Sequence, residues 1–228
     1  MKKTFLVINL GLIILLCPRF LFANSRTGDI QIALQRRVSV KMTHVYPTDV
    51  LEFLGRKYGI PSGIEIISDG GTAPDIGDKR IDVNLSDVTV QQALDFIVAN
   101  DARYRWEVAD GVINLIPTDD QQSILNLKVE HFQIRDGSRE QAESAILNLR
   151  QVRIALASSG LEAGNLHLWN NQRATESQRL TSAVSNVTLR QLLNGLAKQS
   201  TFWVTSVFGK YFWVRLSETG TEEIGTGK

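Results

Sequence analysis

Cysteine is almost absent from this sequence, whose 228 residues contain one, Cys17, close to the N-terminus. A single cysteine excludes an internal disulfide, and if Cys17 is removed with an N-terminal segment, thiol catalysis and thiolate metal sites are excluded as well. An excess of charge of one sign is also missing, because 25 Lys and Arg are balanced by 24 Asp and Glu. Nucleic acid and anionic membrane surfaces favour a clustered basic face, so the composition gives no reason to expect either partner.

Recognised catalytic motifs are missing too. The sequence has no Gly-x-Ser-x-Gly elbow, no His-Glu-x-x-His helix and no phosphate-binding loop. A glycine-rich stretch at 69–78 carries Asp69, Asp75 and Asp78, but it lacks the ladder of ligands and the closing bidentate Glu of a recognised calcium loop. We interpret it as a solvated loop and predict no metal site and no cofactor.

The most suggestive polar pairs are His44 with Asp49 and His131 with Asp136, each separated by five residues. A His-Asp pair can orient a general base. An exposed histidine at a strand end beside an aspartate that complements a helix dipole explains the same spacing, and we favour that interpretation. We therefore predict no catalytic residue and no enzymatic activity.

The N-terminus has the organisation of a secretory signal peptide over residues 1–23. Lys2 and Lys3 precede an apolar run over 5–17, and Pro18 and Ala23 lie before a polar segment. The run is shorter than the roughly 20 residues that a bilayer span needs, which disfavours a retained membrane helix. Lipid attachment at Cys17 is a weaker alternative, since Leu16 and Pro18 fit that type of cleavage site poorly. The sequence predicts export and a periplasmic location, with no stable membrane span after cleavage.

Two helix starts share the same local signals. Thr89 with Gln92, and Thr188 with Gln191, have the spacing of a capping box. Apolar residues follow at helical spacing, and the two sets correspond at a constant offset of 99 residues: Val90, Ala93, Leu94, Ile97 and Val98 in one, and Leu189, Leu192, Leu193, Leu196 and Ala197 in the other. The repeated pattern indicates an internal duplication.

The chain in order predicts two tandem α+β modules at 38–117 and 124–216, each two-layered and built as strand, helix, strand, strand, helix and hairpin. Asp110-Gly111 and Gly209-Lys210 are expected to form the hairpin turns. In the second module we expect strands at 125–129 and 166–169 and a first helix capped by Ser138 and Gln141. Residues 26–37 are expected to be a polar lead-in and 217–228 a disordered tail.

The order of elements around Ile81 to Leu85 and the segment Val88 to Leu94 resembles the secretin and TonB-dependent receptor short N-terminal domain. The likeness extends over 38–117 and, in the second module, from Ser182 onward. It implies a small periplasmic α+β module that binds other proteins: in secretins it forms a ring that docks inner-membrane partners, and in receptors it signals to an anti-sigma regulator. Residues that could build a secretin pore or a receptor barrel are not present after Leu216. The resemblance therefore implies an accessory adaptor.

The second hairpin, 202–216, departs from simple alternation. At the offset of 99, Trp203 and Val207 take the core positions of Tyr104 and Val108. Aromatic side chains are then left on the opposite face, and we predict a partner-binding set there: Phe202, Phe208, Tyr211 and Trp213. An apolar outer face needs a cover, which is either the other module or a partner protein.

The function predicted from the sequence is a periplasmic protein-interaction adaptor of an envelope assembly, such as a secretion or an uptake and signalling system. The partner is expected to be an envelope protein, and self-association is left open. By the family likeness, the final strands at 112–116 and 211–216 are expected in a small sheet with an exposed edge, where strand addition would hold a partner. The alternative is a small-ligand-binding protein or hydrolase in which His44, His131 and Asp49 converge between the modules.

Overall fold

The computed structural model describes residues 27–66, 80–121, 123–164 and 179–217. The elements of the first half are α1 Thr27–Gln35, β1 Arg37–Val45, α2 Pro47–Tyr58, β2 Ser62–Glu65, β3 Ile81–Thr89, α3 Val90–Asn100, β4 Tyr104–Ala109 and β5 Val112–Pro117. The second half comprises η1 Ile124–Asn126, β6 Lys128–Gly137, α4 Arg139–Leu147, α5 Arg150–Ser158, β7 Glu162–Ala163, β8 Leu180–Thr188, α6 Leu189–Ser200, β9 Phe202–Phe208 and β10 Tyr211–Ser217. The predicted α+β class is confirmed.

Local signals form the elements that the sequence predicts. The Thr89, Thr188 and Ser138 hydroxyls each accept a hydrogen bond from the backbone N–H three residues later. The Gln side chain at that position accepts in turn from the backbone N–H of the capping residue. Gly59 ends α2 with a left-handed φ of 65°. Asp87 and Asn186, again 99 residues apart, both have positive φ, at 52° and 57°. The duplication therefore extends to the backbone conformation before each capped helix.

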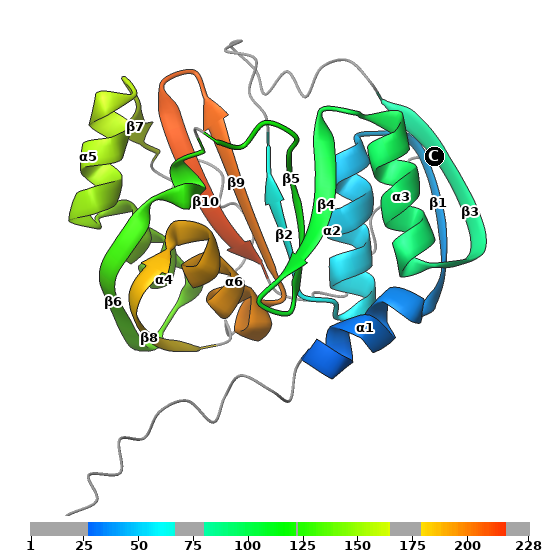
Figure 1. The fold of residues 1–228 in the computed structure, drawn as a ribbon, viewed down its shortest axis with the longest axis horizontal. Coiled ribbons are helices and arrows are strands. Elements are labelled where there is room, and N and C mark those ends of the chain that lie inside the picture. Colours follow the sequence, from blue (N-terminus) through cyan, green and yellow to red (C-terminus); the bar gives the residue numbers. More distant parts are fainter. Residues whose placement is uncertain (1–26, 67–79, 122, 165–178, 218–228) are drawn as a thin grey trace, which may run out of the picture.

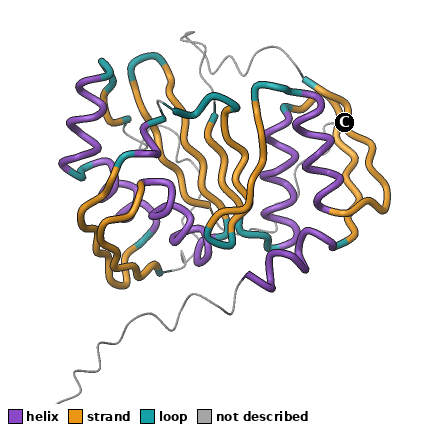
Figure 2. The backbone as a smooth tube through the Cα atoms, in the orientation of Figure 1, coloured by secondary structure: helices purple, strands orange, loops and turns teal. Residues whose placement is uncertain are grey.

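The two modules share one sheet. Its strand order is β4-β5-β2-β9-β10-β7, and the joint is the parallel pair of β2 and β9, in which Gly63 lies opposite Trp203. In each module the helices lie between this sheet and a two-stranded ribbon, β1-β3 or β6-β8, so each module has three layers rather than the predicted two. Figures 1 and 2 show the strands in the middle, with α2 and α3 on one side and α4 and α6 on the other.

The second module is turned over relative to the first. In order along the sheet, β4 is antiparallel to β5, while β5, β2 and β9 are parallel, so β4 and its equivalent β9 run in opposite directions. Equivalent strands that keep their order but reverse their direction are related by a half-turn about an axis that lies in the plane of the sheet, perpendicular to the strands. The helices of the two modules therefore cover opposite faces, and two hydrophobic cores form, one on each face.

Several predictions were wrong in detail. The expected polar lead-in contains α1, whose Ile30 and Leu34 are buried in the first core. The strand expected at 125–129 is a 3-10 turn, η1, followed by β6, and a separate helix, α5, follows α4. The final hairpin strands β5 and β10 are internal, each paired on both sides. Strand β5 is paired with β4 and β2, so the open edge expected there was wrong, whereas on β10 the short strand β7 covers only Tyr211 and Phe212.

Other expectations fall on residues outside the described ranges. The signal peptide at 1–23, the glycine-rich loop at 69–78, the strand at 166–169 and nearly all of the tail belong there. Within the described ranges, no helix combines the length and the apolar character that crossing a membrane requires.

Candidate functional site

Phe202 does not belong to an exposed surface. Its side chain is fully buried and belongs to the core of the first module, which also contains Ile64 and Leu54. Val204, two residues further along β9 on the same face, packs against that core as well. The prediction of Phe202 as a partner-binding residue was therefore wrong, because β9 pairs with β2 and carries this part of the aromatic face under the first module.

The rest of the predicted set lies beyond the cover of the first module. Phe208 pairs with Tyr211 across the hairpin, so both side chains emerge on the face that carries Phe202. Trp213 is half-buried, Tyr211 is 38% exposed, and their rings meet edge to face with centroids 6.4 Å apart. We call Phe208, Tyr211 and Trp213 the outer aromatic face. Its ring types dominate the energetics of protein interfaces.

Gly164 supports Trp213 from beneath. A Cβ on this glycine would lie 2.5 Å from Trp213 Cδ2, closer than real contacts allow. Gly164 N donates to Phe212 O at 2.8 Å, which keeps the backbone after β7 beside β10. The indole therefore lies over Gly164 and remains half-buried.

The charges around the outer aromatic face are already paired. Lys210 Nζ lies 2.7 Å from Glu162 Oε1 and 5.4 Å from the centre of the Tyr211 ring. The hydrogen bond to Glu162 raises the pKa of Lys210. Arg215 Nη2 contacts Glu52 Oε1 of α2 at 3.1 Å. The surface is therefore aromatic at its centre and electrically balanced at its rim.

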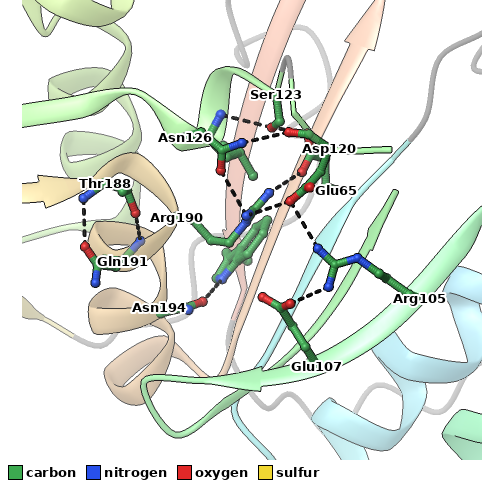
Figure 3. Close-up of polar contacts among 12 residues, drawn as sticks. Glu65, Arg105, Glu107, Asp120, Ser123, Asn126, Thr188, Arg190, Gln191 and Asn194 are labelled. Carbon is green, nitrogen blue, oxygen red and sulfur yellow. Dashed lines mark hydrogen bonds and ion pairs between the residues drawn. The ribbon is translucent and has the colours of Figure 1, made fainter. Parts of the chain in front are cut away.

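A second polar site lies at the joint between the modules (Figure 3). Arg190 of α6 binds Glu65 of β2 through Nη2 at 3.0 Å, and Asp120 of the linker through Nη1 at 3.1 Å. These three side chains are only 11%, 15% and 19% exposed. Asn126 Oδ1 also accepts from Arg190 Nη1 at 3.1 Å, and Ser123 donates to Glu65. One guanidinium thus connects the first module, the linker and the second module.

Arg105 extends this cluster from β4. It pairs with Glu107 and lies 3.3 Å from Asp120 Oδ2, and the hydrogen bond to Glu107 raises the pKa of Arg105. Every charged group of the cluster is an arginine or a carboxylate in an ion pair. The arrangement fixes geometry, because each carboxylate of the cluster is held by an arginine.

Trp203 contributes to the joint on the same face of the sheet, because Gly63 and Glu65 of β2 point to one side. Its Nε1 donates to Asn194 Oδ1 at 2.9 Å, and the ring lies against Gly63, where a Cβ would be 2.0 Å from Trp203 Cε2. Asn194 Nδ2 reaches Ala109 O at 3.3 Å. Strand β9 of the second module thus supplies one large aromatic residue to each core: Trp203 to the core of the second module and Phe202 to the core of the first.

The histidines do not converge with Asp49. His44 is exposed on the β1-β3 ribbon and His131 is exposed on the β6-β8 ribbon. Figure 1 shows these two ribbons at opposite ends of the molecule. His44 N donates to Asp82 Oδ1, and His131 Nδ1 lies 3.3 Å from Ser185 Oγ. Asp49 accepts from Tyr46 N in a capping box, and burial raises the pKa of Asp49. The arrangement that would have supported a hydrolase is not formed.

Metal binding has no support in the part of the chain that the structure describes, where no three His, Cys, Asp or Glu side chains gather as a candidate ligand group. Sequence reasoning missed the joint cluster. Arg190 takes the position of Gln91 at the offset of 99, and this change from amide to guanidinium was the available signal. Its partners Glu65 and Asp120 had no local signal, because long-range folding brings them together.

Comparison of the chain with models of protein families, with curated proteins and with solved structures gives no match.

Proposed function

We propose that this chain is a periplasmic protein-interaction adaptor of an envelope assembly and that it binds an envelope protein through Phe208, Tyr211 and Trp213. The observation that carries the proposal is the division of the aromatic face, with Phe202 closing the joint and Tyr211 exposed beyond it. A surface tryptophan held in place and ringed by paired charges is typical of an interface anchor.

The signal-peptide pattern at 1–23 and the likeness to the secretin and TonB-dependent receptor short N-terminal domain support the location and the class of partner. The shared sheet and the Arg190 cluster support a further point: both modules act as one rigid body, so the outer aromatic face is presented in a fixed orientation. Rigid presentation lowers the entropy cost of binding.

The test compares capture of envelope proteins by the full chain and two variants, Trp213→Ala and Ile154→Ala. Ile154 is the matched control, since it is an apolar side chain of the same module, 58% exposed on α5. We expect Trp213→Ala to weaken capture about tenfold or more and Ile154→Ala to leave it unchanged, with both variants folded by circular dichroism. Equal capture by wild type and Trp213→Ala would overturn the proposal. Unfolding of the second module by Trp213→Ala would assign the ring to the core and overturn it too.

A further inference from the structure

Each strand of the first module has an equivalent in the second, and the half-turn between the modules points equivalent side chains to opposite faces of the sheet. On β5, the residues turned toward the second module are Val112, Asn114 and Ile116, all fully buried. At the offset of 99 their equivalents on β10 are Tyr211, Trp213 and Arg215. The same strip of the repeat is thus covered in one module and open in the other.

A helix supplies the cover on β5. Val112 packs in the second core together with α6 residues such as Leu193, and Asn194 of α6 donates to Ala109 O at the end of β4. Helix α6 therefore serves its own module and also extends across the joint onto its neighbour. Among the described elements, α4 and α6 pack on the other face of β10, with Phe212, Val214 and Leu216, while on the side of the outer aromatic face α2 contacts the end of the strand, where Glu52 pairs with Arg215.

From this pseudo-symmetry we infer that the outer aromatic face receives an amphipathic helix of the partner protein, laid over β10 as α6 is laid over β5. The inference rests on the proposed function and names the form of the partner's binding segment. Two observations favour a helix over an added strand. Strand β9 pairs with β10 along its whole length, and β7 occupies the other side of β10 at Tyr211 and Phe212. The site also continues the face on which α2 covers Phe202.

The chemistry of the helix follows from the rim. Lys210 and Arg215 are each neutralised within the chain, by Glu162 and Glu52. The partner helix therefore binds through an apolar stripe at helical spacing. Its affinity depends weakly on salt, since the charges described at the rim are paired with each other.

The test uses two display libraries as probes against the full chain: single amphipathic helices with a randomised face, and extended peptides of matched length. We expect the helical library to yield binders that shift the Trp213 indole N–H resonance. Trp213→Ala should weaken those binders about tenfold or more, the matched variant Ile154→Ala should not, and raising the salt concentration should have little effect.

Enrichment of extended peptides alone would overturn the inference, as would helical binders that keep their affinity for Trp213→Ala. The two proposals fail separately. If envelope capture depends on Trp213 while no helical binder reaches it, the adaptor function stands and the helix is wrong. If helical binders contact Trp213 while Trp213→Ala captures envelope proteins as well as wild type does, the surface binds helices but is not the adaptor's site.

Discussion

At the scale of single residues, Glu143 is a buried carboxyl whose ionisation opposes folding. It lies on α4 with 5% of its surface exposed, and its Oε1 accepts from Leu216 N of β10 at 2.6 Å. Burial raises its pKa from 4.5 to about 7, more than that hydrogen bond lowers it, while Glu140 raises it and Arg139 and Arg215 lower it slightly. The folded state therefore favours the protonated acid.

The pH dependence follows with a definite sign. Between pH 4.5 and about 7 the folded state binds more protons at Glu143 than the unfolded chain does. The contribution of Glu143 to the free energy of unfolding is therefore greatest below pH 4.5 and falls as the pH rises through 7, by about 3 kcal/mol. Urea denaturation across this range should show the fall in wild type and a flatter profile in Glu143→Gln. Glu130→Gln, at an exposed carboxylate of β6, is the control, and an unchanged slope in Glu143→Gln would contradict this assignment.

At the scale of elements, the features that depend on neighbouring residues could be predicted from the sequence, and those that depend on long-range packing could not. The three capping boxes, the Gly59 terminus and both hairpins could be predicted because a few neighbouring residues determine each of them. Helix α1 was missed since Ile30 and Leu34 gain their burial only from the distant first core. The alternation in β9 showed that Phe202 and Trp203 face opposite ways. It could not show that each has a core of its own, because that depends on pairing with β2.

Two glycines test the packing of β2 and α6. Gly63→Ala would place a Cβ 2.0 Å from the Trp203 ring, whereas at Gly195, inside α6, nothing lies within 4 Å. We expect Gly63→Ala to lower the free energy of unfolding by about 1–3 kcal/mol through overpacking, and Gly195→Ala to raise it by about 0.5–1 kcal/mol through helix propensity. Denaturant titration of both variants measures the difference. A neutral Gly63→Ala would mean that Trp203 does not lie on β2.

At the scale of the whole molecule, the duplication produced one body with two cores rather than two independent domains. The repeat was visible in the sequence, but the turned-over second module was not, because equal elements at a constant offset say nothing about relative orientation. The joint also explains why the outer faces of the hairpins differ. At the positions of Phe202 and Val204, the first copy has Arg103 and Arg105, so only the second hairpin could bury this face against a neighbouring module.

The Arg190 cluster should contribute measurably to this coupling. Arg190→Gln, which installs the residue of the first copy, leaves Glu65 and Asp120 facing each other without the guanidinium that joins them. We expect a loss of about 2–3 kcal/mol in the free energy of unfolding, since the group is largely buried. Arg37→Gln is the control: its pair with Asp87 is exposed, at 62% and 76%, and should contribute less than about 1 kcal/mol. Equal effects of the two substitutions in urea denaturation would show that the cluster does not couple the modules.

Hydroxyl-radical footprinting of the full chain tests the division of the aromatic face in one measurement. It reports the solvent accessibility of Phe202, Trp203, Tyr211 and Trp213 separately. The structure predicts that Phe202 and Trp203, both fully buried, are protected, while Tyr211 and Trp213 are oxidised. Oxidation of Phe202 at a rate similar to that of Tyr211 would show that the modules do not share the sheet. Protection of both Tyr211 and Trp213 would show that no aromatic surface is open for a partner.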